Sequence, residues 1–455
     1  MAGRQKPLKQ APQRNQAAER AVLESPVCAE GATPAQRDIP ASTREVNEIE
    51  MEVQVQSQHA RPSRVLSTLR PRALTPAASA HLDLIRALAA WAVMWGHVRG
   101  NFFADFQHVR HNSALLEALY FLTGFGHQAV MVFFVLSGFL ISSSIISSQM
   151  SGTWSWRDYA INRSSRLYVV LIPGLLFGLL WDKLGSSLFA STGLYSQPLE
   201  NFGPAIAQNQ ITVRTFIGNL FFLQTIVCPT LGSNGPLWSL SNEFWYYVLF
   251  PVGLFAGLAW AKRSMLRAIP LTILAVGLLV FLGSDQTIGF LVWMAGCLLV
   301  IAHSAFPSLA KRWLIPYALI SSATLVVCLL AARTGRLAAL GTDLSVGVAF
   351  TLFLFAVLYV DFGTRSAHYH NAARFFAGFS YSLYVLHFPL LLFLRAWIVP
   401  SQRWQPDVPH LFYGATIGAA ALSFAWLVST FTENKTRVVR NWMRSVIPRF
   451  DGRSN

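Results

Sequence analysis

Long apolar runs separated by short polar stretches make up most of the chain after residue 76. Most of these runs approach the roughly 20 residues that an α-helix needs to cross a bilayer. We therefore predict an all-α integral membrane protein. The apolar segments lie at about 82–99, 128–149, 166–183, 215–228, 237–260, 268–283, 286–303, 314–332, 343–361, 375–398 and 411–431. Segment 215–228, with 14 residues, is short for a span and is typical of a re-entrant or interfacial segment.

Basic residues decide how many of these segments cross the membrane. If 215–228 does not cross, the main Lys and Arg clusters of the loops fall on the same side as the basic N-terminal region, as the positive-inside rule requires. These clusters are Arg157 with Arg163 and Arg166, Lys262 with Arg263 and Arg267, Lys311 with Arg312, Arg365 with Arg374, and Lys435 to Arg449. We predict about ten transmembrane helices with both termini in the cytoplasm, and Arg333, Arg336 and Arg403 on the opposite side.

Composition agrees with a membrane protein and divides the chain into three parts. Hydrophobic residues make up 53% of the chain and charged residues 13%, so membrane topology explains the net charge of +15 better than nucleic-acid binding. Residues 1–76 are polar and aperiodic, and we expect a disordered cytoplasmic tail that is retained. The transmembrane domain is expected over 80–432, followed by a basic cytoplasmic tail over 433–455. The four cysteines have spacings that suggest neither a disulfide framework nor a metal site.

The helix predicted around His81–Gly100 carries two unusual polar residues, Arg86 and His97. Eleven positions amount to about three turns, so the two side chains share one face, roughly 16 Å apart along the axis. Asp83 precedes Arg86 by one turn and can pair with it. Ionisable residues inside a membrane segment usually mark a functional site, although a lone His is also often structural.

Glu243 is the most conspicuous acid of the apolar segments, because a carboxylate inside a membrane needs a partner or a water-filled cavity. Ser137 and Gly138 interrupt another apolar run, which indicates close helix packing or a break that lines a cavity. Arg163 and Arg166, one turn apart, fit either a phosphate-binding pair or a positive-inside anchor.

Another polar stripe is expected near the C-terminal end. Ser380, Tyr384 and His387 are spaced by four and three residues, so they share a face of an otherwise apolar helix. A structural histidine and a site histidine are equally compatible with this pattern.

Taken together and in this order, these stretches resemble the acyltransferase 3 family of bacterial membrane acyltransferases. The resemblance extends over about residues 80–445. It rests on Asp83, Arg86 and His97; on Phe133 to Ile141, including Ser137; on Arg163, Arg166, Leu167 and Tyr168; on Leu237, Trp238, Ser239, Leu240 and Glu243; and on Ser380, Tyr381, Tyr384 and His387. The resemblance also implies about ten spans, in agreement with the charge pattern.

The resemblance implies a bacterial inner-membrane O-acyltransferase. It would move an acyl group, typically acetyl, from cytoplasmic acyl-CoA to a hydroxyl of a sugar-containing acceptor such as a surface polysaccharide or glycolipid. No tightly bound cofactor or metal is expected. His97 is the candidate base, Glu243 either orients His97 or is the base itself, and Arg86 belongs to the catalytic group. Arg163 and Arg166 are candidates for the CoA phosphates. Asp83, Ser137, Trp238, Ser239, Tyr384 and His387 are expected to support the site or contact substrate.

Two other classes stay open from the residues alone. Intramembrane Arg, His and Glu also suit a proton-coupled transporter or flippase of a polar solute. A membrane sensor that recruits partners through its N-terminal tail is the third possibility.

Overall fold

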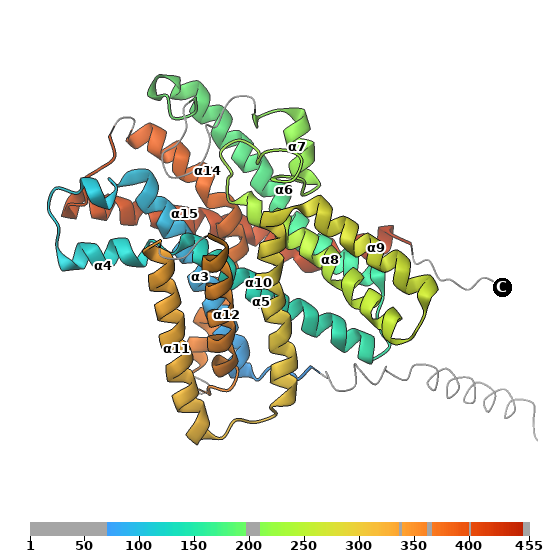
Figure 1. The fold of residues 1–455 in the computed structure, drawn as a ribbon. Helices are drawn as coiled ribbons and strands as arrows, with labels where there is room; N and C mark the ends of the chain where they lie inside the picture. The colour runs from blue at the N-terminus through green and yellow to red at the C-terminus, as the bar shows by residue number, and fades with distance from the viewer. Residues whose placement is uncertain (1–70, 197–209, 336–338, 362–365, 400–401, 449–455) are drawn as a thin grey trace, which may run out of the picture. The chain divides into compact units, whose positions relative to one another are not determined.

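The computed structural model describes residues 71–196, 210–335, 339–361, 366–399 and 402–448. These residues form helices joined by turns and loops, without a β-strand among them (Figure 1). Nine helical segments in this part of the chain are long and apolar enough to cross a membrane, and Gly341–Val357 is a shorter apolar helix. The prediction of an all-α membrane protein is confirmed; the prediction for residues 1–70 lies outside the described residues.

Most predicted spans correspond to observed helices. Their bounds are α3 Pro76–Phe102, α5 Gly126–Met150, α6 Trp156–Leu188, α8 Leu237–Ala261, α9 Met265–Leu282, α10 Ser284–Ala305, α11 Lys311–Arg333, α12 Ala339–Val357, α14 Ser380–Ile398 and α15 Val408–Phe431. Side-chain caps start several of them. Thr75, Ser155 and Asp407 each accept a hydrogen bond from a backbone N–H of the first turn of the helix that follows.

Some boundaries differ from those predicted. Helix α6 begins at Trp156, so Arg163 and Arg166 lie on the helix rather than in the loop before it. The predicted segment 375–398 is divided at Gly378 into α13 Ala367–Ala377 and α14. Part of the predicted C-terminal tail forms α16 Thr436–Val446, which packs against α6. The start of α6 follows a local cap at Ser155, and α16 packs on a distant element; hydropathy reports neither caps nor packing.

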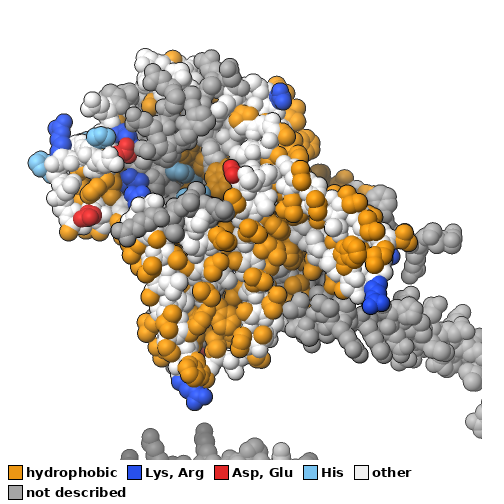
Figure 2. All heavy atoms as spheres, viewed as in Figure 1, with side chains coloured by type: hydrophobic (Ala, Val, Ile, Leu, Met, Phe, Trp, Pro, Cys, Tyr) orange, Lys and Arg blue, Asp and Glu red, His pale blue; other side chains and the backbone are white. Residues whose placement is uncertain are grey.

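Apolar side chains cover the surface of several helices, as expected for contact with lipid. Helix α9 packs along α8, and α11 packs along α12 (Figure 1). Both α9 and α11 leave large hydrophobic residues exposed, such as Ile273, Val280, Leu319 and Val327. Figure 2 shows these regions covered by hydrophobic side chains, with Lys and Arg near the helix ends.

Small residues bring α5 and α10 into close contact. A Cβ atom added to Gly138 would lie 1.9 Å from the carbonyl oxygen of Trp293 on α10. Ser137, beside it, accepts a hydrogen bond from the Trp293 indole at 3.1 Å. Gly138 is therefore a packing residue, and Ser137 points toward the polar groups described below.

Segment 215–228 does not form a spanning helix. It contains α7 Val213–Leu220 and then an irregular loop that continues to α8. Asn219 holds this loop: its amide donates to the carbonyl oxygens of Thr215 and Pro229, and its carbonyl oxygen accepts from the N–H of Leu231. Irregular backbone at membrane depth needs such internal partners, or a cavity to line.

The loop before α8 is also tied to α6. Asp182 is 1% exposed and accepts a hydrogen bond from the N–H of Ser233 at 2.7 Å. Gly232 has φ of +54°, and a Cβ there would lie 2.0 Å from the Asp182 carboxylate. Glycine is required at this position because any side chain would meet both a strained backbone and the carboxylate.

Candidate active site

Helix α3 carries polar groups to two separate pockets. Arg86 lines the first, which we call the arginine pocket; His97, about three turns further along α3, lines the second, which we call the histidine cavity. Val130 and Tyr384 line both. The two pockets are therefore neighbours along the same helix.

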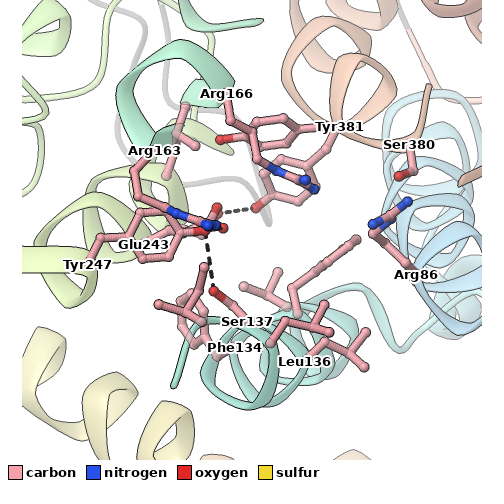
Figure 3. A pocket seen from close by; sticks show the side chains of 17 residues that line it. Arg86, Phe134, Leu136, Ser137, Arg163, Arg166, Glu243, Tyr247, Ser380 and Tyr381 are labelled. Carbon is pink, nitrogen blue, oxygen red and sulfur yellow. Dashed lines mark hydrogen bonds between the residues drawn. The ribbon is translucent and has the colours of Figure 1, made fainter. Parts of the chain in front are cut away.

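The arginine pocket is small, with a volume of about 120 Å³. Arg86, Arg163 and Arg166 supply three positive charges, and Glu243 supplies one negative charge. Figure 3 shows Arg163 and Glu243 on one side of this space and Arg86 across from them. The rest of the wall is largely apolar and comes mainly from α5, with Phe133, Phe134, Leu136, Leu140 and Ile141. Such a pocket suits a short apolar group attached to an anionic molecule.

Glu243 belongs to a polar network inside this pocket. Tyr247, one turn later on α8, donates a hydrogen bond to the Glu243 carboxylate, and Ser137 donates to the Tyr247 hydroxyl at 3.4 Å. The Arg163 guanidinium lies 5.9 Å from the centre of the Tyr247 ring. Both Arg163 and Arg166 act electrostatically on the Glu243 carboxylate. Glu243 therefore balances part of the positive charge of the pocket.

Two acids stabilise the position of Arg86. Asp83 forms the predicted ion pair with Arg86 at 3.1 Å. Glu433, which follows α15, acts electrostatically on Arg86 and Arg166, and its carboxylate accepts hydrogen bonds from the N–H and hydroxyl of Ser382. Arg86 also donates to the carbonyl oxygen of Ala377 at 3.4 Å, at the end of α13.

The histidine cavity is much larger, with a volume of about 850 Å³. Part of its wall is the irregular loop before α8, including Thr230, Ser233 and Pro236. Trp238, at the start of α8, lines it as well and stacks on His127 with ring centres 5.9 Å apart. A cavity of this size accommodates a ligand as large as an oligosaccharide fragment.

His97 and His387 form a hydrogen-bonded pair. Nδ1 of His97 lies 2.7 Å from Nε2 of His387, and Nδ1 of His387 lies 2.8 Å from the carbonyl oxygen of Leu383. Because a carbonyl oxygen can only accept, Nδ1 of His387 carries the hydrogen. With both rings neutral, Nε2 of His387 then accepts from Nδ1–H of His97. This network assigns the unprotonated nitrogen of His97 to Nε2, the tautomer that a general base needs.

Tyr384 lies where the pockets adjoin. Its hydroxyl and the Ser239 hydroxyl are 2.7 Å apart. Ser239 lines the arginine pocket, whereas Tyr384 lines both pockets. Hydroxyl groups at this junction can donate to an oxygen that becomes negative during acyl transfer.

The sequence predicts His97, Glu243 and Arg86 in one catalytic group, but the structure divides the candidate residues between two pockets. Arg86, Ser137, Arg163, Arg166, Ser239 and Glu243 share the arginine pocket, whereas His97 and Trp238 belong to the histidine cavity. His387, rather than Glu243, is the hydrogen-bond partner of His97 Nδ1. Tyr247 and Glu433 were missed. The i, i+4 spacing from Glu243 could have indicated Tyr247. Glu433 lies at the end of the last apolar segment, where the family resemblance continues, but we expected this stretch to lie away from the site.

The described residues contain no group of three His, Cys, Asp or Glu side chains that could hold a metal ion. In the part of the chain that the structure describes, nine helices of spanning length, with an arginine pocket beside a histidine cavity, define the class: a helical membrane protein with two adjoining polar pockets.

Comparison with known proteins identifies the family. The model of the acyltransferase 3 family, described as an acyltransferase domain, matches residues 79–430. The chain belongs to this family. It is similar to "Acyltransferase MdmB" of Streptomyces mycarofaciens, with 29% identity over 179 residues. That match covers 37% of this chain and 37% of the relative. No solved structure shows significant similarity to the chain.

Proposed function

We propose that this protein transfers a short acyl group from acyl-CoA to a hydroxyl of a sugar-containing acceptor. The donor's thioester end occupies the arginine pocket, and the acceptor occupies the histidine cavity. The observation that carries the proposal is the His97–His387 pair, which leaves a basic nitrogen on His97 in the wall of the larger cavity. The proposed location is the bacterial inner membrane, with both termini cytoplasmic.

His97 acts as the general base in this proposal. Its Nε2 takes the proton of the acceptor hydroxyl while the oxygen attacks the thioester carbonyl. The acyl–oxygen bond forms, the acyl–sulfur bond breaks, and the departing thiolate of CoA takes the proton from the His97 imidazolium, which restores the neutral base. The hydrogen bond from His97 Nδ1–H to His387 stabilises the positive charge that develops on His97 and fixes the ring. In the hydrogen-bonded pair of Ser239 and Tyr384 one hydroxyl donates to the other, and the hydrogen that is left is placed to be donated to the carbonyl oxygen.

The arginine pocket supports an acyl-CoA donor of short chain length. Three guanidinium groups make the pocket electropositive, which attracts the anionic donor while its thioester end enters the pocket. Its small volume of about 120 Å³ and its largely apolar wall fit a short acyl group next to the thioester. Acetyl is therefore the proposed acyl group. No tightly bound cofactor takes part in this scheme.

The composition of the histidine cavity supports a sugar-containing acceptor. Trp238, Phe388 and Tyr384 offer aromatic faces, and Gln107 and Gln210 offer amide groups. Aromatic faces pack against the apolar faces of sugar rings, and amides bind hydroxyl groups. A glycolipid or surface polysaccharide is the proposed acceptor class.

Label transfer distinguishes this proposal from a transporter. Purified protein in liposomes receives acetyl-CoA labelled in the acetyl group, together with glycolipids extracted from the source bacterium. The proposal predicts label in an extracted product, detected by chromatography and mass spectrometry, and none with the His97→Ala variant. A polar solute crossing the vesicle membrane unmodified, with no labelled product, would favour the proton-coupled carrier. A variant without residues 1–70 keeps its transfer activity if the protein is an enzyme rather than a tail-dependent sensor.

A further inference from the structure

Two arginines of the histidine cavity have no role in the acyl transfer described so far. Arg99 lies on α3, two residues after His97, and Arg333 is the last residue of α11. Both line the cavity. The Arg99 guanidinium lies 5.2 Å from the centre of the Tyr120 ring, and the Arg333 guanidinium packs against Gly124, where a Cβ atom would approach within 2.8 Å.

These arginines lack the partners that a third arginine of the same region has. Arg403 forms two hydrogen bonds to the Asp105 carboxylate, at 2.7 Å and 3.1 Å. Asp105 acts electrostatically on Arg99, but Arg403 already occupies both of its oxygens. Within the described ranges, neither Arg99 nor Arg333 has a side-chain hydrogen bond or an ion pair, and Arg99 Nε is buried without an acceptor.

The part of the cavity wall that Arg99 and Arg333 form is therefore positively charged. Arg99 and Arg333 are close enough to repel each other. Two like charges whose neighbouring acid, Asp105, is already paired with Arg403 lower the stability of a cavity wall unless a ligand compensates them. Under the proposed topology this wall is on the non-cytoplasmic side, where Lys and Arg are depleted from short loops. Binding of an anionic ligand explains why two arginines occur in this wall.

We propose that the acceptor carries an oxyanion, a phosphate or a carboxylate, that Arg99 and Arg333 bind while its hydroxyl faces His97. This inference rests on the proposed function and adds the charge class of the acceptor. Guanidinium groups bind either oxyanion through paired N–H donors. Trp238 and Tyr384 then contact the sugar ring between the anion and the reacting hydroxyl.

The test measures sugar binding without any acyl donor. Full-length protein in neutral detergent is titrated with glucose 1-phosphate, glucuronate and glucose by isothermal calorimetry. The expected result is at least about tenfold tighter binding of an anionic sugar than of glucose, the effect of one charge-assisted interaction. Tighter binding of glucose 1-phosphate assigns a phosphate, and tighter binding of glucuronate assigns a carboxylate.

Variants locate the anion in the cavity. Arg99→Gln and Arg333→Gln are each expected to weaken binding of the anionic sugar about tenfold and to leave glucose unchanged. Gly124→Ala keeps every charge but displaces the Arg333 guanidinium, so it should reproduce part of the Arg333→Gln loss. Arg110→Gln is the matched control, because Arg110 is exposed and does not line the cavity. Size-exclusion profiles check that each variant is folded.

Equal affinity for the three sugars, including no measurable binding of any, would overturn the inference. Unchanged anion binding in both Gln variants would overturn it too. Acetyl-CoA affinity is measured in parallel: if Arg99→Gln and Arg333→Gln weaken acetyl-CoA instead of the anionic sugar, the two arginines belong to the donor site. Because these titrations contain no acyl transfer, their outcome is independent of whether the protein transfers label from acetyl-CoA.

Discussion

The arginine pocket and the histidine cavity differ in size, charge and construction. The first encloses about 120 Å³ between packed helices and concentrates three arginines around one carboxylate. The second encloses about 850 Å³, and an irregular loop forms part of its wall. A tight, charged pocket fits one chemically constant molecule, whereas a large cavity with loop walls fits a bulky, variable one. The difference suggests that donor and acceptor enter different pockets and meet near Tyr384.

His97→Ala is expected to have the largest effect on acyl transfer. Removing a general base costs about 10²- to 10⁴-fold in rate. If His97 serves only the acceptor side, the affinity for acetyl-CoA stays unchanged. Transfer of labelled acetyl groups, together with acetyl-CoA binding, measures both quantities. His111→Ala is the control, because His111 is an exposed histidine outside both pockets. Transfer within threefold of wild type would remove His97 from the mechanism.

His387→Phe is expected to lower kcat about 10- to 100-fold, the effect of one hydrogen bond to a charged group. The substitution removes the acceptor for His97 Nδ1–H, so the tautomer of His97 is no longer fixed. The KM for acetyl-CoA should not change. His387→Gln supplies a carbonyl oxygen that can accept this hydrogen, and it should recover part of the rate. A purely structural role predicts equal losses in both variants.

Glu243→Gln should change donor binding in the arginine pocket. The substitution removes the carboxylate that faces Arg163, Arg166 and Tyr247. We expect the KM for acetyl-CoA to rise about tenfold, with kcat within about threefold of wild type. Glu117→Gln, at an exposed acid of α4 (Ala114–Leu122), is the control. A fall in kcat as large as that of His97→Ala would instead indicate that Glu243 is the base. It would contradict separate roles for the two pockets.

Asp182→Ala should have the smallest effect on transfer and a clear effect on stability. It leaves the Ser233 N–H of the cavity loop without its acceptor, which costs about 1–3 kcal/mol. We expect a lower thermal midpoint and at most a several-fold loss of transfer. Lys183→Ala, at the next and exposed residue, should change neither. A midpoint equal to wild type would show that Asp182 does not hold the loop.

The sequence predicted most of the spans, because apolar length is a local property. It also predicted the Asp83–Arg86 pair, whose partners are one helical turn apart. The contact of His97 with His387 could not be predicted, since the two residues are 290 positions apart. For the same reason Glu433, near Arg86 and Arg166, was placed in a tail. The residue types of the site were readable from motifs, but their division between two pockets required the packing of α3, α5, α8 and α14.

The most direct test of separate donor and acceptor pockets compares His97→Ala with Glu243→Gln in one assay. Binding of labelled acetyl-CoA and transfer of its acetyl group are measured on the same preparations. The two-pocket account predicts that His97→Ala binds acetyl-CoA like wild type but transfers about 10²- to 10⁴-fold more slowly, whereas Glu243→Gln binds it about tenfold more weakly and transfers at near-normal rates at saturation. Loss of acetyl-CoA binding in His97→Ala, or equal loss of transfer in both variants, would contradict it.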